Sequence, residues 1–99
     1  MTFFTRRDGQ LFAEDVALSA IADRVGTPCY VYSRAAITEQ FLAYQNADIP
    51  QQRLICYAVK ANSNIAVLNV LARLGAGFDI VSVGELERVL AAGGEASKI

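Results

Sequence analysis

The sequence predicts an α/β fold whose parallel sheet begins near Leu54. Two observations carry this prediction. First, apolar runs of strand character alternate from there onward with amphipathic runs of helical spacing, with a repeat of about 25 residues. Second, the first of these strand-like runs is apolar on both faces, as parallel strands covered on both sides are. Such alternation is typical of parallel strands joined by right-handed helical crossovers.

The segment before this sheet predicts a β-rich arm and one helix. Residues 3–13 have the character of a strand or arm, because aromatic and apolar side chains flank a polar turn at residues 7–10. Residues 15–25 carry apolar side chains at helical spacing, and Gly26 ends this predicted helix. Residues 29–32 (Cys-Tyr-Val-Tyr) predict a short strand, whose tyrosines we expect in the core.

A helix and the first strand of the sheet follow. Ser33 is placed to cap a helix over residues 34–46, because a serine side chain can accept a hydrogen bond from the first free N–H groups. Residues 46–52 contain Asn, Asp and Pro and predict a loop. Residues 53–60 (Arg-Leu-Ile-Cys-Tyr-Ala-Val-Lys) then predict the first strand.

The rest of the chain repeats this order. Capping residues at 62–64 (Asn-Ser-Asn) open a predicted helix over residues 65–74. Residues 77–82 predict a second buried strand, and the Ser-Val-Gly-Glu sequence at 82–85 has the spacing of a capping box that opens another helix. Residues 96–99 are expected to begin a third strand.

These units are too few to form a closed structure. An open sheet of three strands leaves an apolar edge exposed, and a closed (β/α)8 barrel needs roughly 250 residues. The chain has 99 residues. We therefore expect it to be the N-terminal piece of a longer protein.

Composition narrows the range of functions. Hydrophobic residues make up 54% and charged residues 19%, which is typical of a globular protein. The net charge of −1 gives no support for nucleic-acid binding, and no apolar run approaches the roughly 20 residues of a membrane helix. The first residues lack the apolar core of a secretory signal, so the cytoplasm is the expected location.

Cysteine and histidine usage argues against a metal site. The chain has no histidine, and its two cysteines, Cys29 and Cys56, are far apart in sequence. Both lie in apolar, strand-like runs, so we expect small buried thiols rather than a disulfide.

Lys60 is the candidate for chemistry. Side chains alternate across a strand, so the predicted strand places Cys56, Ala58 and Lys60 on one face. If this strand belongs to a barrel, that face is the interior and Lys60 lies at the carboxyl end, where barrel active sites are found. An amine there can attack an aldehyde, and the small Ala58 leaves room for a flat ring. The alternative is a solvated strand end whose side chain turns away from the core.

The wider sequence resembles a known family. Residues 57–64 (Tyr-Ala-Val-Lys-Ala-Asn-Ser-Asn) resemble the lysine motif of the fold-type III pyridoxal-phosphate (PLP) decarboxylases, which include the diaminopimelate, ornithine and arginine decarboxylases. Residues 77–86 resemble the second strand and following helix of that family. Residues 11–16 and 26–33 resemble the diaminopimelate decarboxylase branch in particular.

The resemblance implies a fold. It implies the N-terminal part of a PLP-binding (β/α)8 TIM-like barrel, similar to that of alanine racemase, preceded by a strand or arm of a separate β-domain. Residues 1–33 would be the arm, with strands and a helix, partly belonging to the β-domain. Residues 34–99 would hold the first helix and the first two βα units of the barrel.

The resemblance also implies roles for individual residues. Lys60 would be the catalytic residue and would carry PLP as a Schiff base. Asp79 would lie near that amine and orient it or balance its charge, unless it serves only as a hydrogen-bonded strand carboxylate. Ala58 would line the cofactor pocket, or simply pack in the strand. Glu85 matches an acidic residue of the family, but a helix cap is sufficient to explain it.

The implied function is PLP-dependent decarboxylation of meso-2,6-diaminopimelate to L-lysine and CO₂ by a homodimeric full-length enzyme, with no nucleic-acid or membrane partner. The cofactor carries such chemistry and the protein sets orientation. Three alternatives stay open: a decarboxylase of the same fold for ornithine, arginine or a carboxylated polyamine, a non-catalytic PLP-binding barrel, and a remnant without function. The 99 residues alone are expected to be inactive.

Overall fold

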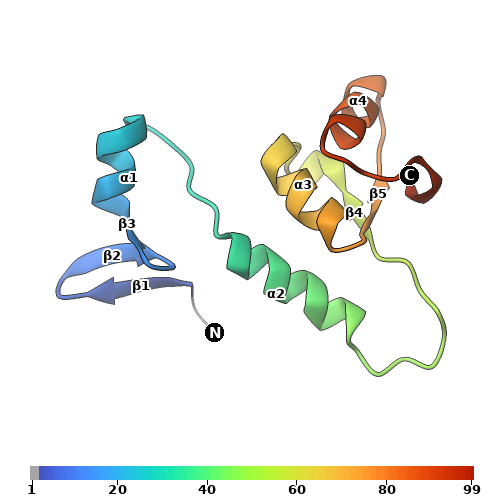
Figure 1. Cartoon of the computed structure of the whole chain (residues 1–99), viewed down its shortest axis with the longest axis horizontal. Helices are drawn as coiled ribbons and strands as arrows, with labels where there is room; N and C mark the ends of the chain where they lie inside the picture. Colours follow the sequence, from blue (N-terminus) through green and yellow to red (C-terminus); the bar gives the residue numbers. More distant parts are fainter. Residues whose placement is uncertain (1–2) are drawn as a thin grey trace. The chain divides into compact units, whose positions relative to one another are not determined.

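The computed structural model describes residues 3–99, so the first two residues of the predicted arm lie outside the described part. The chain forms two compact units, one reaching to Ala36 and the other spanning Ile37–Ile99. Figure 1 shows the first unit in blue to cyan and the second in green to red. No helix in residues 3–99 combines the length and the apolar character that crossing a membrane requires.

The first unit is a small antiparallel sheet with one helix. Its strand order is β1-β2-β3. Asp8 and Gly9 form the tight turn between the first two strands with φ angles of 51° and 80°, a conformation that Asp-Gly sequences favour in hairpins. The polar turn predicted at residues 7–10 is therefore confirmed. The elements are β1 (Phe4–Arg7), β2 (Gln10–Ala13), β3 (Val16–Ala17) and α1 (Leu18–Val25).

Several predictions for this unit are wrong. The helix predicted from residue 15 begins only at Leu18, because residues 16–17 pair with β2 as a third strand. Residues 29–32 are not a strand, since they have no ladder partner among residues 3–99. The tyrosines there are not core residues: Tyr30 is 90% exposed and Tyr32 51%, and their rings stack on each other at 6.4 Å.

The N-terminus of α2 (Arg34–Gln45) carries the predicted cap and a second acceptor. The Ala36 N–H donates to Ser33 Oγ at 3.0 Å, which confirms Ser33 as the capping residue. Glu14 Oε2 accepts hydrogen bonds from Ser33 Oγ at 2.8 Å and from the Ala35 N–H at 3.1 Å. A carboxylate is favourable at this end of a helix because the free N–H groups carry partial positive charge.

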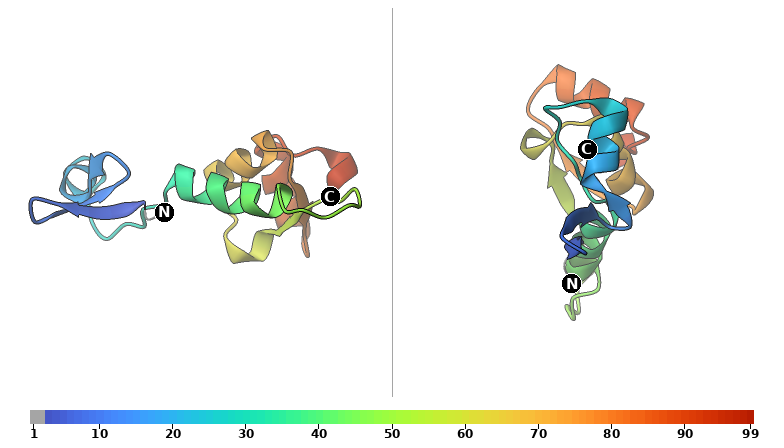
Figure 2. Two further views of the ribbon diagram at one scale, coloured as in Figure 1. Left: turned by 90° about the horizontal axis from the view of Figure 1, so that it is seen from below. Right: turned by 90° about the vertical axis from the view of Figure 1, so that its left-hand side faces the viewer.

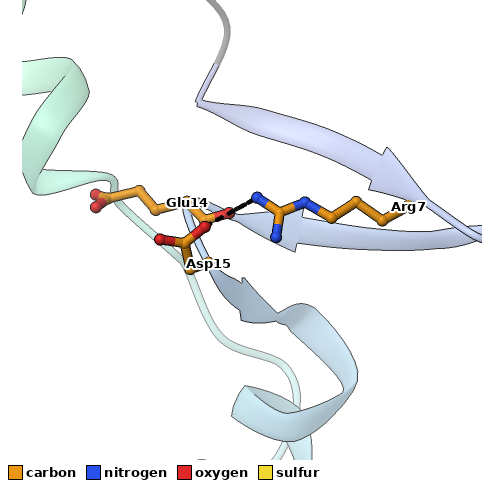
Figure 3. Close-up of polar contacts among 3 residues, drawn as sticks. All are labelled: Arg7, Glu14 and Asp15. Atoms are coloured by element: carbon orange, nitrogen blue, oxygen red, sulfur yellow. Dashed lines mark hydrogen bonds and ion pairs between the residues drawn. The ribbon is translucent and has the colours of Figure 1, made fainter.

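The turn that carries Glu14 is fixed by Arg7. The Arg7 guanidinium forms an ion pair with Asp15 at 2.9 Å and donates to the Glu14 carbonyl at 3.1 Å, as Figure 3 shows. Glu14 itself has a φ of 55°, in the left-handed region. Its side chain points away from Arg7, toward the start of α2 (Figure 3).

The Glu14 contacts predict a pH dependence of stability. Hydrogen bonds from the Ala35 backbone and then from Ser33 lower the pKa of Glu14 below its ordinary value of 4.5. A lowered pKa in the folded state stabilises the fold above pH 4.5, and this contribution is lost as the pH falls through the lowered pKa. Urea unfolding of wild type and Glu14→Gln should therefore differ at pH 7 and converge below pH 4.5. A difference that stays constant down to about pH 3 contradicts this assignment. Glu39→Gln, at an exposed position of α2, is the control for loss of one carboxylate.

The second unit is a β-α-β unit followed by a further helix. Strands β4 and β5 are parallel neighbours, and the chain passes from one to the other through α3 (Figure 1 and Figure 2). The order strand, helix, strand, helix is as predicted. After α2 the elements are β4 (Cys56–Ala58), the 3₁₀ turn η1 (Val59–Ala61), α3 (Ile65–Arg73), β5 (Gly77–Asp79), α4 (Val83–Ala91) and the 3₁₀ turn η2 (Ala96–Lys98).

The strands of this unit are shorter than predicted. The strand predicted over 53–60 pairs only at Cys56–Ala58, and the one predicted over 77–82 pairs only at Gly77–Asp79. Each strand has one ladder partner in the described part of the chain, so pairing ends where that partner ends. Residues 96–98 form a 3₁₀ turn instead of a third strand.

The core of the second unit lies between the sheet and its helices. Phe78, Leu68, Val59 and Val89 are its largest fully buried side chains. They come from β5, α3, the turn after β4, and α4, and Tyr57 of β4 packs against the same apolar cluster. α2 adds Phe41, and α3 adds Val67 and Leu71. This core fixes the sheet edge from which the candidate site is built.

Candidate functional site

The predicted site residues lie at or just beyond the carboxyl ends of the two strands. Ala58 is the last residue of β4 and Asp79 the last of β5, and the two are register partners. Lys60 follows Ala58 by two residues and lies in the 3₁₀ turn η1 instead of in the strand. The predicted strand alternation therefore ends before Lys60. The turn, not the strand, sets the direction of the lysine side chain.

Ala58 and Asp79 lie on the face of the sheet that the helices leave open. Phe78 is 2% exposed within the core, and its register partner Tyr57 packs against that core. Because side chains alternate, Ala58 and Asp79 point to the opposite face. Asp79 is exposed there. Cys56 shares this face and is also exposed, so its predicted burial is wrong.

Over Gly77, at the amino end of β5, the same face is covered by the chain itself. A Cβ added to Gly77 would lie 2.8 Å from Cys56 Sγ and 2.9 Å from the Lys98 carbonyl oxygen. Glycine is therefore required at this position, because any side chain would collide with backbone. The open part of the face is the carboxyl end, where Ala58 and Asp79 lie.

The turn that carries Lys60, residues 59–64, has a fixed backbone; we call it the Lys60 turn. Val59 is 0% exposed and anchors the turn in the core. The Asn62 N–H donates to the Val59 carbonyl at 3.1 Å, and the Tyr57 hydroxyl donates to the Asn62 carbonyl at 3.0 Å. Lys60 itself is exposed, and no hydrogen bond or ion pair within residues 3–99 holds its amine. The backbone is thus ordered while the amine is available.

The end of the Lys60 turn caps the next helix. Asn64 Oδ1 accepts from the Ala66 N–H at 2.9 Å and the Val67 N–H at 3.4 Å, so the predicted cap of α3 is confirmed. Asn62 Oδ1 accepts from the Asn64 N–H at 3.0 Å. Asn62 therefore makes a backbone contact of the kind predicted for the capping residues 62–64.

Glu85 is occupied by the start of α4. The Glu85 N–H donates to Ser82 Oγ at 3.2 Å, and Glu85 Oε1 accepts from the Val81 N–H at 3.0 Å. This reciprocal pair confirms the predicted capping arrangement, although the carboxylate bonds one residue earlier than in the standard box. The cap alone accounts for this side chain.

Sequence reasoning missed the long-range contacts, and one of them reaches the Lys60 turn. Arg88 Nη1 donates to the Ser63 carbonyl at 3.2 Å, so α4 contacts the Lys60 turn across 25 residues of sequence. No local pattern could indicate this contact, because it depends on how α4 packs beside α3.

Other features within residues 3–99 do not form a second candidate site. No group of three or more acidic, cysteine or histidine residues within 3–99 could hold a metal ion. Cys29 is free and exposed, against the predicted burial. A cavity of about 330 Å³ lies beside the C-terminus of α2, but none of the predicted site residues lines it. Arg53 there donates to the Tyr44 carbonyl at 3.0 Å and so caps that helix end.

Comparison with known proteins gives consistent matches. Residues 34–99 match the family described as "Pyridoxal-dependent decarboxylase, pyridoxal binding domain". The chain is 67% identical over 99 residues to diaminopimelate decarboxylase of Pseudomonas aeruginosa, covering 100% of this chain and 24% of that protein. It is 60% identical over 100 residues to the Vibrio cholerae diaminopimelate decarboxylase, again covering 100% and 24%.

The fold of the chain also matches solved structures. A protein from Aquifex aeolicus superposes with a TM-score of 0.89 at 49% identity, covering 97% of this chain and 24% of that one. Diaminopimelate decarboxylase from M. jannaschii, in co-complex with L-lysine, gives a TM-score of 0.82 at 33% identity, covering 90% and 22%. The chain thus spans about a quarter of the length of these relatives, with coverage of 22% to 24%.

Proposed function

The chain belongs to the pyridoxal-dependent decarboxylase family, and we propose its function from this membership. The proposal concerns the full-length protein, by which we mean a protein that contains this sequence and has the length of its relatives. We propose that it decarboxylates meso-2,6-diaminopimelate to L-lysine and CO₂ with PLP, as the last step of lysine biosynthesis. The observation that carries this proposal is 67% identity to a diaminopimelate decarboxylase along all 99 residues.

The residues present fit PLP. An aldehyde cofactor needs an accessible amine, and Lys60 is exposed on an ordered turn. A flat ring needs free space, and the small Ala58 lies on the open face at the carboxyl end of β4. Asp79 adds one carboxylate beside Ala58 on the same face. The arrangement agrees with the general position of active sites in barrels of this class.

Each of these residues has a proposed role. PLP, when bound, supplies a conjugated ring that takes up the electron pair left when CO₂ departs. Lys60 would hold the cofactor through its Nζ amine, and the same nitrogen would hold or deliver a proton during the reaction. Asp79 would orient the amine through charge, and Ala58 would leave space for the ring.

Borohydride reduction tests this assignment directly. Reduction of the full-length protein with PLP should fix one pyridoxyl mass on the peptide that holds Lys60. The sequence contains one other lysine, Lys98, which lies 3.5 Å from Glu95 and serves as an internal control. A label on Lys98 in place of Lys60 overturns the assignment. Comparing CO₂ release from meso-diaminopimelate, ornithine and arginine then identifies the substrate.

The remaining properties extend the same proposal. The substrate would be a small-molecule amino acid, in keeping with the L-lysine complex of the M. jannaschii relative. The full-length protein would be a cytoplasmic homodimer, which light scattering can test. A decarboxylase for ornithine or arginine stays as the second candidate because the matched family covers pyridoxal-dependent decarboxylases as a whole.

A further inference from the structure

We propose that Arg88 is a positioning residue: it holds the Lys60 turn against α4 and thereby sets where the Lys60 amine can reach. This inference rests on the proposed function of Lys60. The observation behind it is the hydrogen bond from Arg88 Nη1 to the Ser63 carbonyl at 3.2 Å. A guanidinium donor makes this bond charge-assisted and therefore stronger than a neutral one.

The Lys60 turn is held by three different elements. Three consecutive carbonyls each accept one hydrogen bond: that of Asn62 from the Tyr57 hydroxyl, that of Ser63 from Arg88, and that of Asn64 from the Leu68 N–H at 3.0 Å. The donors belong to β4, α4 and α3, respectively. Two of these donors lie within five residues of their acceptors, whereas Arg88 is 25 residues away. Of these three hydrogen bonds, the one from Arg88 is therefore the only one that joins the turn to an element distant in sequence.

Arg88 can do this because α4 is itself fixed at both ends. The capping contacts of Ser82 and Glu85 define its first turn. Near its other end, Asn69 Nδ2 donates to the Ala92 carbonyl at 2.9 Å and links α4 to α3. Between these points Val89, the neighbour of Arg88, is 0% exposed in the core. Arg88 thus extends from a helix whose rotation is determined.

The consequence concerns Lys60. Val59 anchors one end of the turn in the core, and the carbonyl contacts hold the other. Removal of the Arg88 contact leaves the second half of the turn held only by neighbours in sequence. The turn then samples more backbone conformations, so Lys60 Nζ spends less time where it meets the cofactor.

The experiment compares Arg88→Ala with wild type in the full-length protein. Two readouts are used: hydrogen exchange of the amides at residues 60–64, and the PLP concentration that gives half-maximal borohydride labelling of Lys60. Labelling of Lys98 is the reference within each sample. We expect exchange to accelerate and the half-maximal PLP concentration to rise, each by about fivefold, as the loss of one such hydrogen bond predicts.

Arg73→Ala is the matched control. Arg73 is exposed on α3 and donates to Asn69, on the same helix, at 3.1 Å. The substitution therefore removes a guanidinium and one hydrogen bond, but no contact to the Lys60 turn. It should match wild type in both readouts. Arg88→Lys keeps the charge and one donor and should restore part of the effect.

The outcomes separate the two hypotheses. If Arg88→Ala has the same amide exchange rates and the same half-maximal PLP concentration as wild type, the positioning role is overturned. If wild type is not labelled at Lys60, the proposed function fails. Faster amide exchange in Arg88→Ala than in Arg73→Ala would still support the role of Arg88 in holding the Lys60 turn. If Arg88→Ala does not fold, Arg88→Gln replaces it, because glutamine keeps the stem but shortens the reach, and wild-type behaviour of that variant also overturns the inference.

Discussion

Lys60→Ala is expected to lower the rate of CO₂ release from meso-diaminopimelate by about three to four orders of magnitude in the full-length protein. The substitution removes the amine that we propose to bind the cofactor and to move the proton. It leaves the backbone of the Lys60 turn in place, because none of the hydrogen bonds that hold this turn involves the lysine side chain. The loss should therefore appear in the rate of the reaction and not in the unfolding free energy.

Two further variants make this prediction specific. Lys98→Ala removes the other lysine, whose contacts are Glu95 at 3.5 Å and the Gly75 carbonyl at 3.5 Å, and it should retain activity within about twofold of wild type. Lys60→Arg keeps the positive charge but not the nucleophilic amine, so it should be as inactive as Lys60→Ala. More than a tenth of wild-type activity in Lys60→Ala would contradict the assignment.

Features that depend on neighbours in sequence were predictable. The caps at Ser33, Asn64 and Ser82 are formed by side chains that bond backbone N–H groups within three residues. The Asp8-Gly9 turn likewise follows from the two residues that adopt it. The order of strands and helices in the second unit follows from hydrophobic periodicity. These features need no knowledge of what packs against them.

Burial of particular side chains was not predictable in the same way. Cys29, Tyr30 and Cys56 lie in apolar runs, yet all three are exposed. An apolar strand is buried only when a partner covers it, and residues 3–99 supply no partner for residues 29–32 and no helix on the open face of β4. Periodicity states which residues share a face, but not whether that face is covered.

The candidate site was predictable only in part. The family resemblance placed Lys60, Ala58 and Asp79 together, and the register of the two strands brings Ala58 beside Asp79. The 3₁₀ turn at Lys60 was missed, because the pattern continues as apolar alternation past the point where strand pairing ends. The contact from Arg88 to Ser63 was missed because it spans 25 residues.

Phe78→Ala is expected to lower the free energy of unfolding by about 3–5 kcal/mol, as removal of a buried aromatic side chain does. Phe78 is 2% exposed and lies in the cluster that Val59 and Val89 also fill. The backbone of residue 94 fits against its ring: a Cβ added to Gly94 would lie 3.2 Å from Phe78 Cε2. Because helices on one side and backbone on the other hold this pocket, the cavity left by alanine cannot collapse fully.

The matched control for this substitution is Tyr44→Ala. Tyr44 is an aromatic residue of the second unit that is 69% exposed, so its loss should cost less than about 1 kcal/mol. Urea unfolding followed by circular dichroism measures both values. Equal small effects of the two variants would show that Phe78 is not a core residue. Val59 packs in the same cluster as Phe78 and anchors the Lys60 turn. If Phe78→Ala has the expected large effect, Lys60 of that variant should therefore also be labelled more weakly by PLP than Lys60 of wild type.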